Sequence, residues 1–170
     1  MNVVFLDFDG VLNTDAYQVH LRATGKPGWD DFGQLFDPEA IGNLKRILDA
    51  VPDVRIVVES TWKAEGLDHL RRMWKARNLP GELYDVTPDI FNEELLTIDL
   101  SDPDNIKKIE GIGKGKEISA WLEHHGGDCK YVIFDDAAEF SGELAGHHIH
   151  VGHDIGITAD DAMKAITYLR

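Results

Sequence analysis

Short, continuous apolar runs alternate along the chain with segments whose apolar residues recur at helical spacing. The runs predict strands at residues 3–8, 54–58, 83–86, 131–134 and 148–151, and the spaced segments predict helices at residues 37–51, 64–77, 116–125 and 158–169. Continuous apolar strands are typical of parallel sheets covered on both faces, and strands that alternate with helices form such sheets. We therefore predict an α/β, Rossmann-like fold, in which a parallel sheet of about five strands carries helices on both faces.

The chain has 170 residues, a length that fits one compact domain, so we expect residues 1–170 to form a single domain. Residues 14–36 and 89–115 show no clear periodicity, and we expect them to form lids or rims around a site. The remaining spaces leave little or no room for a cap domain. The glycines within residues 111–115 do not complete a P-loop, which needs Ser or Thr after its lysine, so a flexible loop is predicted there.

The composition adds a strongly acidic balance, with 31 Asp and Glu against 17 Lys and Arg and a formal net charge of −14. Such a surface repels polyanions and argues against a broad basic groove for nucleic acid. The single cysteine, Cys129, excludes disulfides within the chain and fits a reducing cytoplasm. The chain starts with no signal-peptide pattern, and no stretch approaches the roughly 18 apolar residues of a spanning helix. We expect a cytoplasmic monomer or homodimer with no membrane partner.

Acidic residues follow two of the predicted strands. Asp7 and Asp9 come at the end of the first strand, and Asp135 and Asp136 at the end of the fourth. Ligands of an open parallel sheet bind beyond the carboxyl ends of its strands. Converging carboxylates repel one another unless a cation holds them together, and hard oxygen ligands suit Mg²⁺. The pattern predicts a magnesium site for phosphoryl transfer, in which one of the two alternating aspartates attacks and the other handles protons.

Other residues at the same predicted edge suit a phosphate. Gly10 permits a sharp turn and is expected to bring backbone N–H groups near the phosphate. Ser60 or Thr61, after the second strand, can donate hydrogen bonds to phosphoryl oxygens. Lys116, at the start of a predicted helix, can neutralise charge in the transition state, with Lys114 as the alternative.

These motifs together resemble the haloacid dehalogenase (HAD) superfamily. Residues 5–12 are similar to its first motif, hhhhDxDGxL, and residues 56–61 to its second, a Ser or Thr after an apolar strand. Lys116 corresponds to the third motif, and Asp135 with Asp136 to the fourth, an acidic pair, so the match spans nearly the whole chain. The stretches 60–63, 118–122 and 156–158 are similar to a small branch found in RNA-repair proteins and phages. The phosphatase domain of phage polynucleotide kinase-phosphatase has a related pattern.

The resemblance implies a phosphatase with a covalent intermediate. Asp7 would attack phosphorus and form an aspartyl-phosphate, and Asp9 would protonate the leaving oxygen and then activate water. Mg²⁺ would be held by Asp7, the backbone carbonyl of Asp9, Asp135, and Asp136 either directly or through water.

On the substrate side, the sequence departs from the pattern because Glu59 comes straight after the apolar run. Which of Ser60 and Thr61 faces the site is therefore open, and Ser60 is favoured. Lys63 stands where some polynucleotide phosphatases have an Arg, so it is a candidate substrate contact. A nearly capless site favours a nucleotide or nucleic-acid end, the acidic surface argues against strong polynucleotide binding, and a small phosphorylated metabolite is the alternative.

A phospho-accepting receiver domain is the rival from a different class, since it too combines acids, a Thr and a Lys on a parallel sheet. It would carry adjacent acids after the first strand and an acceptor Asp after the third. Here the acids alternate as Asp7 and Asp9, and the second strand is followed by no acceptor Asp. A degenerate HAD-like binding protein is disfavoured because the acid set is complete.

Overall fold

A parallel sheet forms the centre of the computed structural model, which describes residues 1–90, 93–125 and 128–170. In these residues the sheet has five strands in the order β5-β4-β1-β6-β7, and every neighbouring pair is parallel. The strands are β1 (Asn2–Leu6), β4 (Val54–Val58), β5 (Leu83–Val86), β6 (Lys130–Asp135) and β7 (His148–His150). The predicted sheet is confirmed, and β1 lies at its middle.

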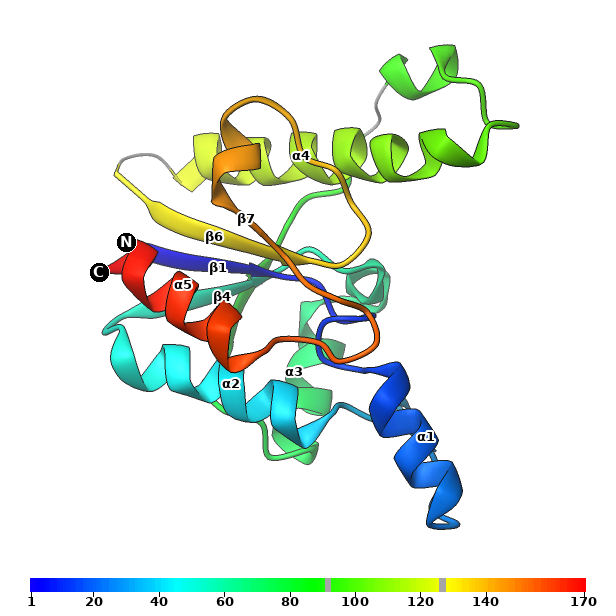
Figure 1. Cartoon of the computed structure of the whole chain (residues 1–170). Helices are drawn as coiled ribbons and strands as arrows, with labels where there is room; N and C mark the ends of the chain where they lie inside the picture. Colours follow the sequence, from blue (N-terminus) through cyan, green and yellow to red (C-terminus); the bar gives the residue numbers. More distant parts are fainter. Residues whose placement is uncertain (91–92, 126–127) are drawn as a thin grey trace.

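Helices cover both faces of the sheet (Figure 1). The helices are α2 (Pro38–Ala50), α3 (Leu67–Ala76) and α5 (Ala159–Leu169) on one face and α4 (Ile106–His125) on the other. Alternation along β1 explains the two cores, because Val4 and Leu6 pack against the first set while Val3 and Phe5 pack against α4. The helix predicted at residues 64–77 divides into a 3₁₀ helix, η1 (Thr61–Glu65), and α3.

The segment 14–36 forms a small insertion between β1 and α2. It contains α1 (Asp15–Ala23) and a hairpin of two short antiparallel strands, β2 (Trp29–Asp30) and β3 (Gly33–Gln34). Thr14 caps the start of this helix, because its side chain accepts a hydrogen bond from the backbone of Tyr17. The insertion between β1 and α2 is small, in agreement with the prediction that the chain has little or no room for a cap domain.

The flexible loop predicted at residues 111–115 is wrong, because these residues lie within α4. Isolated glycines lower helix propensity, but in this helix a glycine allows close packing against a neighbouring segment. A Cβ atom at Gly111 would collide with the backbone carbonyl of Glu139, so the helix approaches the loop after β6 only without a side chain. The rest of the segment 89–115 includes two 3₁₀ helices, η2 (Glu93–Thr97) and η3 (Pro103–Asn105), and its residues 91–92 lie outside the described residues.

The connections from β1 and β6 leave in opposite directions across the sheet. After β1 the chain moves to β4 and β5, and after β6 it moves to β7 on the other side. The carboxyl ends of β1 and β6 therefore flank a topological switch point, where open α/β sheets bind ligands. Within the described ranges, none of the helices combines the length and the apolar character that crossing a bilayer requires.

Candidate active site

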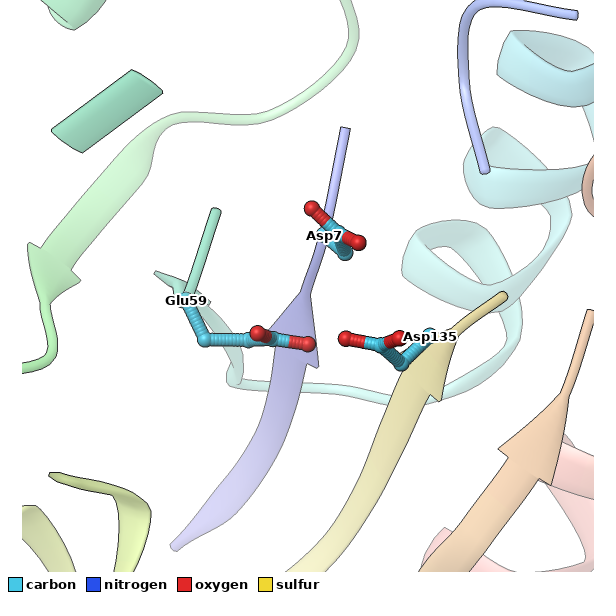
Figure 2. A group of neighbouring side chains, drawn as sticks. All are labelled: Asp7, Glu59 and Asp135. Carbon is cyan, nitrogen blue, oxygen red and sulfur yellow. The ribbon is translucent and has the colours of Figure 1, made fainter. Parts of the chain in front are cut away.

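Three carboxylates converge at the carboxyl edge of the central strands. Asp7 follows β1, Glu59 follows β4 and Asp135 ends β6, so the neighbouring strands place them side by side (Figure 2). One carboxylate oxygen from each lies within 4.8 Å of the others. All three side chains are buried; Glu59 is 1% exposed and Asp135 is fully buried. The meeting of the first and last acidic clusters at one point is the arrangement that the sequence predicted.

Lys114 supplies the positive charge within this cluster. Its Nζ lies 3.1 Å from Asp7 Oδ2, 2.6 Å from Asp135 Oδ2 and 3.1 Å from Glu59 Oε2. The prediction of Lys116 is wrong, because residues two apart on a helix point roughly 200° away from each other. Lys116 lines a separate cavity between α4 and the region of η4 (Gly142–His147). Since α4 extends through Lys114, the lysine at the site lies one half-turn earlier than expected.

Burial and mutual repulsion shift the proton affinities of the cluster. Burial, together with the nearby Asp135, raises the pKa of Asp7 to about 7, against the opposing effect of Lys114. Burial raises the pKa of Glu59 well above its ordinary value, and the two aspartates add to this. Burial also opposes ionisation of Asp135, but Lys114 and hydrogen bonds from the backbone of Ala138 outweigh it and lower the pKa of Asp135. Burial alone would lower the pKa of Lys114, but three carboxylates raise it, so the lysine stays charged.

Glu59 is the residue at this site that motif comparison passed over. Neither of its carboxylate oxygens has a well-aligned hydrogen bond among the described residues, although Lys114 lies nearby. Leaving a buried carboxylate without hydrogen bonds is costly. The available signal was the one used for the other acids, a charged residue immediately after an apolar strand next to β1.

The donor set fits a hard divalent cation. Three carboxylates face a single ammonium, so the cluster remains net negative when all three are ionised. The carboxylate of Glu59, whose oxygens lack a well-aligned hydrogen bond among the described residues, points into the cluster (Figure 2). Carboxylate oxygens without nitrogen or sulfur donors match Mg²⁺ better than Zn²⁺. The residues present therefore suit the magnesium ion that the sequence predicted.

Raised carboxyl pKa values predict that the metal-free protein loses stability as pH rises. Near neutral pH the folded state holds protons on Asp7 and Glu59 that the unfolded chain, with ordinary pKa values of about 4, has released. The free energy of unfolding must then fall with pH between about 5 and 8, by roughly 1.4 kcal/mol per pH unit for each extra proton held. The lowered pKa of Asp135 acts in the opposite sense, but only at lower pH.

We expect the Tm measured in EDTA to drop by several degrees between pH 5.5 and pH 8, and Glu59→Gln to reduce that drop. Excess Mg²⁺ should also reduce it, because the cation neutralises the same charges. A pH-independent Tm in EDTA, or a Glu59→Gln protein with an undiminished drop, would contradict this assignment of buried charge.

Asp9 is held by two side chains at the turn after β1. Its Oδ1 accepts hydrogen bonds from Trp62 Nε1 at 3.1 Å and from Asn13 Nδ2 at 2.8 Å. Trp62 therefore combines packing against Phe8 with a hydrogen bond to a residue of the site. With Oδ1 engaged by two donors, the carboxylate of Asp9 is fixed in orientation beside the cavity that Asp7 also lines.

Gly10 is needed for the backbone but does not offer its N–H to a phosphate. Its φ is +76°, and a Cβ atom there would collide with the carboxylate of Asp136. Its N–H donates to the side-chain and backbone oxygens of Asn13, at 2.8 and 3.0 Å. The turn itself therefore uses this donor, and the prediction that the turn brings other backbone N–H groups near a phosphate stays a prediction.

Thr61, not Ser60, faces the open space of the site. Ser60 is fully buried, and its hydroxyl caps η1 by accepting a hydrogen bond from the backbone of Trp62 at 3.2 Å. Thr61 is exposed and lines the cavity next to Asp7. The preference for Ser60 is thus wrong in geometry, because Glu59 takes the first position after the strand and moves the exposed hydroxyl one residue further on.

Lys63 is saturated by protein partners. Its ammonium donates to Glu117 Oε2, to the carbonyl and hydroxyl of Thr87 at 3.2 and 3.1 Å, and to the carbonyl of Pro88 at 3.3 Å. An ammonium has three protons, and these contacts use them. Lys63 therefore ties η1 to α4 and to the loop after β5, and the prediction that it contacts substrate does not fit this arrangement.

A cavity of about 590 Å³ opens over these residues, and its lining is strongly acidic. Two lysines, Lys63 and Lys114, face seven carboxylates, which belong to Asp7, Asp9, Glu59, Asp89, Glu110, Glu117 and Asp136. Burial and the neighbouring Asp135 raise the pKa of the half-buried Asp136. Four residues of the segment 89–115 contribute to this lining: Asp89, Glu110, Gly113 and Lys114.

Comparison with known proteins gives one match. The family model described as "HAD domain in Swiss Army Knife RNA repair proteins" matches residues 3–162. No curated protein and no solved structure matches the chain. The matched range includes every residue placed at the site above and all residues of the five sheet strands except Asn2. The chain is therefore a member of the family of HAD domains found in Swiss Army Knife RNA repair proteins, a family of the phosphatase type.

Proposed function

We propose that this chain is a magnesium-dependent phosphatase that hydrolyses a phosphate monoester through an aspartyl-phosphate on Asp7. The observation that carries the proposal is the buried convergence of Asp7, Glu59 and Asp135 within 4.8 Å, with Lys114 between them. A site that concentrates carboxylates in this way repels a phosphate unless a cation is present.

Asp7, Asp135 and the backbone carbonyl of Asp9 would hold Mg²⁺, with Asp136 reaching it directly or through water. The geometry adds Glu59 as a further carboxylate at the same point. The bound ion would neutralise phosphoryl oxygens in the transition state. Lys114, on α4, would help to neutralise the negative charge of the same phosphoryl oxygens. Thr61 offers its hydroxyl to the phosphoryl group at the cavity surface.

The protein's own residues account for both steps. A carboxylate oxygen of Asp7 bonds to phosphorus as the bond to the leaving oxygen breaks, and Asp9 gives that oxygen a proton. Asp9 then takes a proton from water, the water oxygen bonds to phosphorus, and the bond to Asp7 breaks to release phosphate. The hydrogen bonds of Trp62 and Asn13 to one oxygen of Asp9 leave its other oxygen for this proton transfer.

The substrate that we propose is a nucleotide or the phosphorylated end of a nucleic acid, and the family's association with RNA repair supports it. The acidic lining and the net charge of −14 favour a single terminal phosphate over a long stretch of backbone.

Metal removal tests the proposal. Hydrolysis of an aryl phosphate should fall to background in EDTA and return when Mg²⁺ is added in excess, because the uncompensated carboxylates exclude the phosphate. Ca²⁺ serves as the control cation, since its larger, more flexible shell should support less turnover. Turnover that is unchanged in EDTA would overturn the metal-dependent mechanism.

A further inference from the structure

A second cavity, of about 290 Å³, lies beside the acidic one and has an aromatic lining. Thr61 and Ala64 line both cavities, so the two lie next to each other at η1. The ring-bearing residues of the second cavity come from the hairpin, η1 and α3, and they are Trp29, Phe32, Trp62 and His69. Aromatic and apolar side chains predominate in this lining, whereas charged side chains predominate in the lining of the acidic cavity.

The hairpin wall of this cavity is anchored. Arg77, from the end of α3, makes a bidentate ion pair with Asp30, at 2.9 and 2.7 Å, and donates to the carbonyls of Gly33 and Gln34, each at 3.1 Å. Its side chain is 8% exposed, and the guanidinium lies 5.9 Å from the ring of Trp62. A wall fixed by four hydrogen bonds presents its side chains in one arrangement, which lowers the entropic cost of binding.

Trp29 projects from this anchored hairpin and is 65% exposed. An exposed tryptophan on a fixed support leaves a large flat apolar surface in water, which burial against a ligand would remove. The neighbouring ring of Phe32 packs edge-on against His69, with centroids 5.4 Å apart, so a pair of contacting rings forms part of the lining.

Trp62 connects this aromatic cavity to the reaction. Its ring lines the cavity, while its indole N–H donates to Asp9 Oδ1 at 3.1 Å. The general acid must lie on the side of the phosphorus from which the alcohol leaves. The aromatic cavity therefore lies on the side where the leaving group of a phosphate ester belongs.

We infer that the Trp29–Trp62 cavity is a leaving-group subsite that stacks the nucleobase of the substrate's terminal nucleotide. The inference rests on the proposed phosphatase function and specifies how that site selects its substrate. A nucleobase stacks on aromatic rings without any positive charge on the protein. A strongly acidic protein can therefore recognise a nucleotide through its base. The ligand expected in this subsite is a planar base that lies next to a single reactive phosphate.

The test compares adenosine monophosphates, with the phosphate at the 3′ or the 5′ position, with glycerol phosphate, which has no ring. Wild type should prefer a nucleotide, and Trp29→Ala should lower kcat/KM for it by about 10-fold or more, since stacking on one base contributes roughly 1–3 kcal/mol. Glycerol phosphate turnover should stay unchanged, and Trp29→Phe should restore most of the nucleotide activity. Tyr168→Ala, which removes a 45% exposed ring from α5, is the matched control and should have no effect. A phosphorylated oligonucleotide with the same terminal base separates a free nucleotide from a nucleic-acid end as the source of that base.

The possible failures are distinguishable. If wild type hydrolyses glycerol phosphate as well as the nucleotides, and Trp29→Ala changes neither, the subsite is overturned while the phosphatase function stands. Equal losses on both substrates in Trp29→Ala also overturn it, because they indicate a general structural defect. If wild type hydrolyses none of these substrates with Mg²⁺, the proposed function itself fails and the subsite fails with it.

Discussion

Asp7→Asn is expected to abolish phosphatase turnover, with kcat lower by about 10⁴-fold or more. The amide keeps the size of the carboxylate but is a poor nucleophile and a poor ligand for a divalent cation. Asp7 lies at the end of the central strand, 5% exposed, where its Oδ1 accepts a hydrogen bond from the backbone of Phe8 at 2.8 Å. Initial rates on an aryl phosphate with saturating Mg²⁺ measure the effect.

The same substitution should not unfold the protein. It removes one of three mutually repelling buried carboxylates, so we expect the Tm of the metal-free protein to be unchanged or higher. Asp49→Asn, at an exposed position on α2, is the control and should retain full activity. An Asp7→Asn protein within about tenfold of wild-type turnover would rule out covalent catalysis by this residue.

Lys114→Met is expected to have the second largest effect, and Lys116→Met almost none. Methionine keeps much of the length of lysine but removes the charge from between Asp7, Glu59 and Asp135. Breaking a buried ion pair on one side costs about 3–5 kcal/mol, so metal-free Lys114→Met should unfold at a much lower temperature or urea concentration. Losing a fixed charge that stabilises the transition state should also lower kcat by about 10²–10³-fold.

Lys116 makes the comparison sharp, because it lies on the same helix two residues away, at an exposed position. Substitution at such a position usually changes the free energy of unfolding by less than about 0.5 kcal/mol. Lys114→Arg keeps the positive charge and changes the shape of the side chain, so it distinguishes the effect of the charge from the effect of its exact position. Equal losses of activity in Lys114→Met and Lys116→Met would contradict the place given to Lys114.

The sheet and the meeting of the acids were predictable because they depend on patterns that are local in sequence. The apolar runs at 54–58 and 83–86 coincide with β4 and β5. Asp7, near the end of the run 3–8, and Asp135, directly after the run 131–134, meet at the carboxyl edge of β1 and β6. Parallel pairing brings the ends of adjacent strands together whatever the loops do.

The side chains that were misassigned depend on information that is not local. Lys114 replaced Lys116 because α4 extends through the glycine-rich segment, where Gly111 packs closely against the backbone of Glu139, a residue distant in sequence. Thr61 replaced Ser60 because Glu59 occupies the first position after β4 and is paired there with Lys114, which is distant in sequence.

The role of Lys63 also depends on contacts with residues that are distant in sequence. Its place in the motif suggested a substrate contact, but Glu117, Thr87 and Pro88 take up its ammonium. Whether a lysine is available for a ligand depends on what the fold brings around it. The aromatic subsite was likewise not foreseen, because the hairpin that carries Trp29 consists of two strands of two residues each, too short for a periodic signal.

The central claim is that Asp7 and Asp135 share one cation while Asp7 accepts the phosphoryl group. The most direct measurement is a crystal structure of the protein grown with Mg²⁺ and beryllium fluoride, which adds to a nucleophilic aspartate as a mimic of its phosphoryl form. We expect beryllium bonded to a carboxylate oxygen of Asp7, with one Mg²⁺ held between that group and Asp135. Beryllium fluoride on a different residue, or Mg²⁺ bound away from Asp135, would contradict it.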